Sequence, residues 1–200
     1  MSKARSYKPD LILGGAYLPD SIGLVKAAKA VNATPKLFGF LVGPAIADFA
    51  KSLKSDGLFV AGETFWEPFT KTPGNQEFYQ AYLKEYKGEP SYHAAAGFAA
   101  GQILERAIKE VGSTEDKKAL RDKLYSIKTT TIFGEYEVNP LGHPDSGWQI
   151  GKTTNLIQWQ KAEKMVLPNQ VAIEGMIKQI VFPKETKTAE VIYPFPGWNK

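Results

Sequence analysis

Cysteine is missing from this chain of 200 residues, and histidine occurs only twice, at His93 and His143. Disulfide bonds, thiolate nucleophiles and cysteine-ligated zinc are therefore excluded. Two histidines do not make a metal-binding set, and His143 stands in a Gly-His-Pro-Asp turn. No Gly-x-Gly-x-x-Gly or Gly-x-x-x-x-Gly-Lys-Ser/Thr run occurs, so the sequence offers no phosphate-binding loop. We expect neither a metal nor another cofactor.

A catalytic constellation is also missing. No serine stands in a nucleophile-elbow motif. Glu63 and Glu67 lie four residues apart, but the segment between them is expected to be extended, so their carboxylates do not share a helical face. The chain is therefore not expected to be an enzyme.

Neither a strong charge of one sign nor a long apolar run is present. The chain carries 25 Lys and Arg against 21 Asp and Glu, and the two signs are mixed along it. Nucleic acid is therefore not an expected partner. No apolar run approaches the ~20 residues that span a bilayer. The opening residues 1–6 include basic side chains with no apolar run behind them, so we expect no signal peptide here.

The sequence does contain three successive apolar strands, each leading through a Gly- or Pro-marked bend. They lie in residues 9–17, 37–44 and 57–62. Strands that alternate with helices predict an α/β fold with a mostly parallel sheet. The carboxyl ends of such strands form a crevice in which small ligands bind, so we expect a binding site at this edge of the sheet.

Helical spacing predicts the buried faces of the helices between these strands. The first helix opens at Pro19-Asp20 and ends near Asn32, with the buried stripe Leu24, Ala27, Ala28 and Val31. The second follows Gly43-Pro44, with Ile46, Phe49, Ala50 and Leu53 pointing inward.

The middle of the chain reads as a loop followed by helices. The Pro- and Gly-containing composition of residues 67–74 predicts a loop that crosses between two lobes. Asn75 caps a helix that ends at Gly88, with the stripe Phe78, Tyr79, Tyr82, Leu83 and Tyr86. Residues 93–111 predict a long helix, rich in Ala and Gly and therefore central. Ser113 or Thr114 caps the next helix, which ends near Tyr125.

The last third of the chain reads as strands. Residues 134–138 and 154–160 alternate in polarity. From Lys161 onward the pattern weakens and predicts no strand. Residues 193–198 form an aromatic, proline-stiffened tail.

Several stretches, in this order, resemble a known family. They are Lys8–Tyr17, Pro90–Ala100, Thr131–Tyr136, Gln149–Lys152, Gln158–Gln160 and Tyr193–Trp198. Together they resemble the carboxyl-terminal half of type I periplasmic solute-binding proteins, the branched-chain amino acid or amide receptors of ABC importers. The resemblance implies parts of two Rossmann-like lobes joined by hinge crossings, with the ligand between them. It places residues 1–66 in the second lobe and 67–159 in the first, and makes 160–200 a crossing and a tail that returns to the second lobe.

Six residues are candidates for contact with a ligand. Tyr17 directly follows the first strand, at the crevice edge, and the family has a cleft-lining Tyr at the matching position; the alternative is a Tyr that packs on the next helix. Phe65 and Trp66 lie at the expected exit toward the hinge, where a rigid aromatic could stack on a ligand or belong to the core. Tyr92 and His93 precede the Ala-rich helix, at a place that the family uses for the cleft wall. The alternative for His93 is a helix-start residue bonded to a carbonyl.

Leu41 is informative because the resemblance aligns it with an acidic residue. In the family's amino-acid receptors that residue pairs with the ligand's ammonium group. An unpaired ammonium in a closed cleft is costly, which favours a solute other than a plain α-amino acid, unless Asp20 or Glu63 takes the role. The aromatic candidates favour an apolar or aromatic acid, or an amide.

Three function hypotheses follow. The leading one is a binding module that captures a small organic solute between two lobes by hinge closure and delivers it to a membrane ABC permease. By resemblance it works in the periplasm or another extracytoplasmic space. An enzyme on the same fold is the second, and it has no supporting motif. The third is a truncated or partner-dependent fragment of such a receptor, which pairs with a second copy of itself or with the amino-terminal half that the family has and this chain does not. A cytoplasmic ligand sensor on the same fold is a further alternative.

Overall fold

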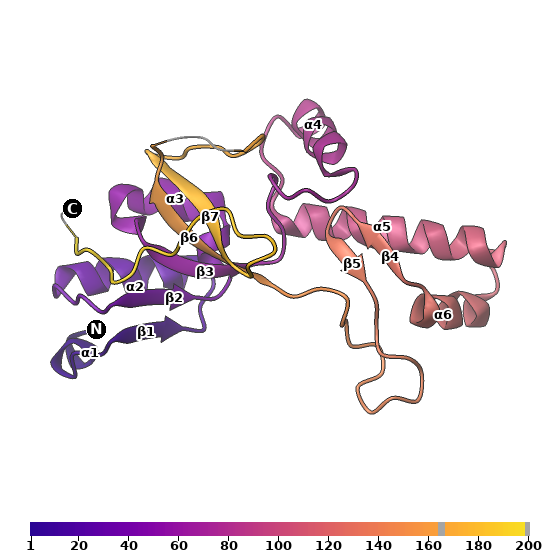
Figure 1. Ribbon diagram of the computed structural model, residues 1–200, viewed down its shortest axis with the longest axis horizontal. Helices are drawn as coiled ribbons and strands as arrows, with labels where there is room; N and C mark the ends of the chain where they lie inside the picture. Colours follow the sequence, from indigo (N-terminus) through magenta and orange to yellow (C-terminus); the bar gives the residue numbers. More distant parts are fainter. Residues whose placement is uncertain (164–166, 199–200) are drawn as a thin grey trace. The chain divides into compact units, whose positions relative to one another are not determined.

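The computed structural model describes residues 1–163 and 167–198. Its contacts divide the chain into two units, each with its own elements (Figure 1). Unit 1 comprises Met1–Thr64 and Thr154–Lys200, and unit 2 comprises Phe65–Thr153. The boundaries expected from the sequence lie at 66/67 and 159/160. The two units divide the chain at 64/65 and 153/154, and the second division arises because the strand that begins at Asn155 pairs within unit 1. The assignment of these segments to a first and a second ligand-binding lobe stays a prediction.

Unit 1 is built on a five-stranded sheet. Its strands, in spatial order, are β1 (Leu11–Gly14), β2 (Leu37–Phe40), β3 (Val60–Thr64), β6 (Asn155–Lys161) and β7 (Met176–Phe182). The first three strands are parallel, and β6 and β7 add to them in antiparallel fashion. The α/β class with consecutive parallel strands is thus confirmed, and the antiparallel half of the sheet is a finding.

The helices of unit 1 follow the strands as expected, with one shifted face. They are α1 (Ser2–Ser6), α2 (Leu18–Ala30) and α3 (Ala47–Leu53), with two short 3₁₀ turns, η1 (Gly43–Ala45) and η2 (Lys54–Gly57). On α2 the buried residues are Ser21, Val25 and Ala28, whereas the predicted Ala27 is exposed. The stripe is rotated because the small Ser21 side chain turns inward and its Oγ donates to the Ala16 carbonyl oxygen at 3.3 Å.

The inward face of α3 is largely as predicted. Phe49, Ala50 and Leu53 are buried, and Ile46 is half-buried just before the helix.

Strand β3 passes close to η1, and Gly62 makes this approach possible. A Cβ atom on Gly62 would lie 2.7 Å from Pro44 Cγ and 2.9 Å from the Leu41 carbonyl oxygen. Real Cβ atoms do not come so near to backbone, so only glycine fits without a shift. The turns that follow β2 are therefore held tightly against the sheet.

The sequence pattern misses strand β7. Five of its seven residues are buried, including Met176, Ile177 and Ile180. Polar residues in its middle break the apolar run, but Lys178 Nζ donates to the Ala45 carbonyl oxygen at 3.0 Å. The partner that makes Lys178 acceptable lies far away in the sequence, so periodicity alone did not find this strand.

The aromatic tail packs onto unit 1. Phe195 and Trp198 lie with their ring centroids 5.3 and 5.4 Å from that of Phe38, a buried residue of β2. The Trp198 indole donates to the Ala33 carbonyl oxygen at 2.9 Å. Beside this tail is a cavity of about 260 Å³ that the Lys29–Asp56 ion pair also lines. None of the six candidate residues lines it.

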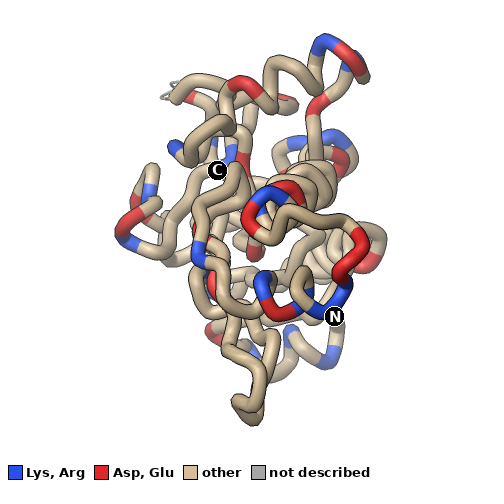
Figure 2. The backbone as a smooth tube through the Cα atoms, turned by 90° about the vertical axis from the view of Figure 1, so that its right-hand side faces the viewer, with Lys and Arg blue, Asp and Glu red and all other residues tan. Residues whose placement is uncertain are grey.

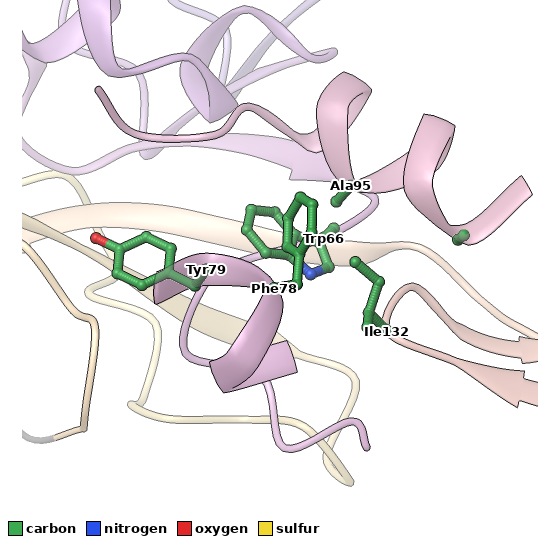
Figure 3. Packing of buried hydrophobic residues seen from close by; sticks show 6 residues of the cluster. Trp66, Phe78, Tyr79, Ala95 and Ile132 are labelled. Carbon is green, nitrogen blue, oxygen red and sulfur yellow. The ribbon is translucent and has the colours of Figure 1, made fainter. Parts of the chain in front are cut away.

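Unit 2 is mainly helical. It contains α4 (Asn75–Tyr86), α5 (Tyr92–Val111) and α6 (Lys117–Ser126), and the antiparallel hairpin of β4 (Thr129–Thr131) and β5 (Gly134–Tyr136). Its core is a cluster of residues from the first connection (Phe65 and Trp66, where the chain enters unit 2), from α4 and α5 and from the hairpin, as Figure 3 shows. The cluster comprises Trp66, Phe78, Tyr79, Ala95, Ala99 and Ile132.

Two helix starts in unit 2 differ from the prediction. Asp116 caps α6, since its Oδ1 accepts from the Ala119 amide at 2.9 Å, whereas Ser113 orders the preceding turn by accepting from the Glu115 amide. Asn75 is the first residue of α4, and Gly74 precedes it as the cap position. The side chain of Asn75 serves the preceding loop, as described below.

Helix α5 is only partly buried. Ala95, Ala99 and Ala107 face the core, but Gly97 and Gly101 are exposed, and a Cβ atom on either would meet nothing within 4 Å. The small residues on that side therefore do not mediate a close helix contact in unit 2, and the expected central position of α5 holds for one face only.

Figure 2 shows Lys and Arg interspersed with Asp and Glu along the backbone. Among the described residues, no helix combines the length and the apolar character required to cross a membrane.

Candidate functional site

Unit 1 brings two candidates, Tyr17 and Leu41, to one edge of its parallel sheet. Tyr17 follows β1 and precedes α2, and Leu41 follows β2. The Leu41 amide donates to the Gly14 carbonyl oxygen at 3.2 Å, which fixes the two strand ends side by side. Both side chains are open, with 74% of Tyr17 and 45% of Leu41 exposed. The alternative in which Tyr17 packs on the next helix does not fit that exposure.

Acidic groups lie near this edge on the same unit. The Glu63 amide donates to the Leu41 carbonyl oxygen at 3.3 Å, so this residue of β3 adjoins Leu41. Asp20 is exposed in the first turn of α2, three residues beyond Tyr17. The edge thus carries an exposed phenol, an exposed aliphatic side chain and nearby carboxylates.

Unit 2 gathers three other candidates, Phe65, Tyr92 and His93, which we call the aromatic wall. The ring centroids of Phe65 and Tyr92 are 5.6 Å apart, and those of Tyr92 and His93 are 4.0 Å apart with the planes 29° from parallel. Phe65 and Tyr92 are half-buried and His93 is exposed. Because Tyr92 and His93 begin α5 and Phe65 is in the first connection, the fold builds this wall from segments that are distant in the sequence.

Trp66 lies in the core of unit 2. Only 3% of it is exposed, and its ring meets that of Phe78 edge to face with centroids 5.9 Å apart (Figure 3). Its indole Nε1 donates to Asn75 Oδ1 at 2.8 Å. These are the contacts of a packing residue, which was one of the two alternatives for Trp66.

Asn75 organises the loop that joins Trp66 to α4. Besides accepting from Trp66, its amide nitrogen donates to the carbonyl oxygens of Pro68 at 3.1 Å and Thr70 at 2.9 Å. Asn75 itself is buried. One side chain thus fixes the path of the chain from Trp66 to α4, which the sequence had indicated only as a helix cap.

Lys152, which no sequence pattern singles out, adjoins the wall. Its Nζ donates hydrogen bonds to the carbonyl oxygens of Phe65 and Phe133, and it lies 4.0 Å from the centroid of the Phe133 ring. Burial lowers the pKa of Lys152 to about 8. A lysine in a Gly-rich turn gives no periodic signal, so only the fold reveals this position.

The candidates therefore form two groups, one on each unit. Tyr17 and Leu41 lie on the strand-end edge of unit 1, and the aromatic wall lies on unit 2, with Lys152 bonded to the Phe65 carbonyl oxygen. Among the described residues, no set of three or more His, Asp or Glu side chains is arranged to hold a metal ion. Each group by itself presents aromatic or aliphatic surface with a few polar groups nearby, which is the kind of surface that lines small-molecule sites.

The sequence of residues 1–155 matches the family described as "Periplasmic binding protein". This chain belongs to the periplasmic binding protein family. The resemblance read from the sequence is thereby confirmed.

Several solved structures share the fold. A leucine binding protein from Thermotoga maritima is 21% identical, with a TM-score of 0.65, and the alignment covers 88% of this chain and 47% of that one. A solute binding protein from Rhodopseudomonas palustris, solved in complex with benzoate, is 18% identical with a TM-score of 0.64, covering 88% and 46%. A branched-chain amino acid transporter substrate binding protein from Streptococcus pneumoniae, solved with isoleucine, is 15% identical with a TM-score of 0.62, covering 92% and 45%. The chain spans about half the length of the solved structures it matches.

Proposed function

We propose that this chain is part of the solute-binding component of an ABC-type importer, and that it captures a small organic solute by hinge closure. The observation that carries the proposal is the family match over residues 1–155. The partners of such a component are the solute and an ABC permease in the membrane, and its place of work is the periplasm or another extracytoplasmic space. Binding here shifts a population from open to closed forms, and no reaction is involved.

The solute class follows from the two groups of candidates. Phe65 and Tyr92 offer flat apolar surface, and Tyr17 offers a phenol at the strand-end edge. No acidic side chain stands at Leu41 to receive an ammonium group. We therefore propose an apolar or aromatic carboxylic acid, or an amide, ahead of a plain α-amino acid.

Thermal unfolding with a panel of solutes tests this proposal. The panel contains benzoate, leucine and isoleucine, with glucose as a negative control. At a concentration of 100 Kd a ligand adds about 2.7 kcal/mol to stability, which raises Tm by roughly 5–10 °C in a chain of this size. We expect benzoate to give the largest shift. Absence of any shift, or consumption of a solute followed by NMR, would contradict the proposal, and consumption would favour an enzyme.

The aromatic wall gives the matched variants. Tyr92→Ala removes a ring of the wall, and Tyr86→Ala removes an exposed ring from the same unit. Each stacked ring contributes about 0.5–1.5 kcal/mol beyond its area. We expect Tyr92→Ala to weaken benzoate binding about tenfold and Tyr86→Ala to leave it unchanged. If the two variants bound benzoate with equal affinity, the aromatic wall would not be part of the binding site.

A second proposal, that further chain must cover unit 1, is favoured by the free edge of its sheet. Strand β1 is the edge of the parallel half, and 48% of Leu11 and 73% of Leu13 are exposed on it. Parallel strands are normally covered on both faces. We infer that a further parallel strand from the rest of a full-length receptor pairs with β1, and that the chain joined to it covers the face that carries Leu11 and Leu13, because the chain spans about half of each structure it matches.

Size in solution tests this second proposal. Without its partner strand, the chain is expected to self-associate through the β1 edge and to exceed its mass of 22.1 kDa. Leu13→Lys places a charge on the exposed face of that edge strand and should restore the monomer, whereas Leu141→Lys, at an exposed leucine of unit 2, should not. A wild-type chain that sediments as a stable monomer would argue against an uncovered edge.

A further inference from the structure

Lys152 occupies an unusual place, because it stands beside both points at which the chain enters and leaves unit 2. Phe65 is the first residue of unit 2 and Thr153 is the last. Lys152 precedes Thr153 and donates to the carbonyl oxygen of Phe65. A single ammonium group thus links the two connections, 87 residues apart in the sequence, entirely within unit 2.

The surroundings of this ammonium group are those of a structural cation. Lys152 is partly buried, and an ammonium group withdrawn from water needs hydrogen-bond acceptors to offset its lost hydration. Here the acceptors are two main-chain carbonyl oxygens, and the face of the Phe133 ring adds a cation–π contact. Gly134 leaves room for the stem, since a Cβ atom there would lie 3.0 Å from Lys152 Cδ.

The same two connections are also held together on the side of unit 1. In the β3–β6 ladder, Thr64 is the register partner of Asn155. The chain therefore leaves unit 1 and returns to it at adjacent positions fixed by backbone hydrogen bonds. On the unit 2 side no backbone ladder performs this task between Phe65 and Lys152 in the described pairings, and the ammonium group takes its place.

We propose that Lys152 is a positioning residue that clasps the two connections at unit 2, so that they move as one. The proposal rests on the proposed function in one respect only, which is that a solute-binding component uses these connections as hinges. A coupled pair of connections allows rotation about one axis and resists independent bending of each. Because the Phe65 carbonyl is one of its acceptors, the clasp also fixes the residue that forms part of the aromatic wall.

Amide hydrogen exchange on the full chain tests the clasp without any solute. The reporters are the hydrogen-bonded amides of Thr70, beyond the first connection, and Gly151, before the second. In Lys152→Met both are expected to exchange at least tenfold faster, while amides in α5 keep their wild-type rates. The matched control is Lys84→Met, which removes an exposed lysine of α4. Acceleration of only one connection, or uniform acceleration throughout unit 2, would overturn the proposal.

Two further measurements separate a clasp from mere packing. Lys152→Arg keeps the positive charge and the donors, so it should restore most of the protection that Lys152→Met loses. In the wild type labelled with ¹⁵N-lysine, one ammonium group should show slowly exchanging protons, and its signal should vanish in Lys152→Arg. If every ammonium group of the wild type exchanges as fast as the exposed ones, the clasp is refuted even if Lys152→Met does not fold. A failed solute panel would leave these results unchanged, so the two proposals fail separately.

Discussion

Asn75 organises the loop from Trp66 to α4 through its side-chain hydrogen bonds. Replacing it by alanine removes the acceptor of the Trp66 indole and the donor to the Pro68 and Thr70 carbonyl oxygens. Buried polar groups that lose their partners cost about 1–3 kcal/mol each. We therefore expect Asn75→Ala to lower the free energy of unfolding by about 2–4 kcal/mol, measured by urea denaturation.

The neighbouring residue provides the control for Asn75. Gln76 is exposed in the same helical turn, so Gln76→Ala should change the free energy of unfolding by less than about 0.5 kcal/mol. If the two variants were equally stable, the hydrogen bonds of Asn75 would not contribute to the fold.

Lys152 gives the chain a pH dependence whose sign can be derived. Burial lowers its pKa in the folded chain from 10.5 to about 8. Between pH 8 and pH 10.5 the unfolded chain keeps the proton on Lys152 and the folded chain does not. The free energy of unfolding therefore rises as the pH is raised through this window, and this contribution is lost when the pH is lowered to 8. Urea denaturation from pH 7 to pH 10 should therefore show the wild type gaining stability relative to Lys152→Met. The other lysines and the tyrosines titrate in both chains, so parallel profiles would contradict a lowered pKa.

At the scale of elements, two glycines in unit 1 predict opposite effects of one substitution. Gly62 of β3 has no room for a Cβ atom beside Pro44, so Gly62→Ala should cost about 1–3 kcal/mol through overpacking. Gly23 lies exposed inside α2 with nothing within 4 Å of its Cβ position, so Gly23→Ala should add about 0.5–1 kcal/mol. Both are measured by thermal and urea unfolding. A destabilised Gly23→Ala would mean that this face of α2 is covered in solution.

The elements that the sequence predicted are those with strong local signals. The sequence predicted the three apolar strands of unit 1 from their Gly- or Pro-marked bends. It predicted α4 from the helical spacing of aromatic residues such as Phe78 and Tyr79, and both signals are local. Strand β7 was not predicted, because Lys178 finds its acceptor on Ala45 of η1 and Gln179 Oε1 accepts from Thr188 Oγ1, at 2.6 Å. Such compensation comes from the tertiary structure and leaves no period in the sequence.

The candidate site was predictable to a similar degree. Tyr17 and Leu41 follow strand ends, and that position alone places them at one edge of a parallel sheet. Tyr92 and His93 depend on the start of α5, which small residues signal. Lys152 could not be found, because its importance comes from the Phe65 carbonyl, to which only the fold brings it.

At the scale of the whole molecule, the two units have separate cores, and their stabilities should respond separately. Gly62→Ala acts on the sheet of unit 1, and Asn75→Ala acts on the core of unit 2. By hydrogen exchange, the first should raise opening rates in β2 and β3 more than in α5, and the second should do the reverse. If either variant accelerates exchange equally in both units, the chain unfolds as one cooperative body.

The pairing of Thr64 with Asn155 has a consequence for how the chain folds. It makes unit 2 a domain inserted into what would otherwise be a hairpin of β3 and β6. Bringing these two strands together from the unfolded chain means closing one very long loop, and its entropic cost grows with its length. Once the inserted domain has folded, its two ends are already neighbours and the loop is effectively short. This favours a folding order in which the inserted unit 2 folds first and the pairing of β3 with β6 in the sheet of unit 1 forms afterwards.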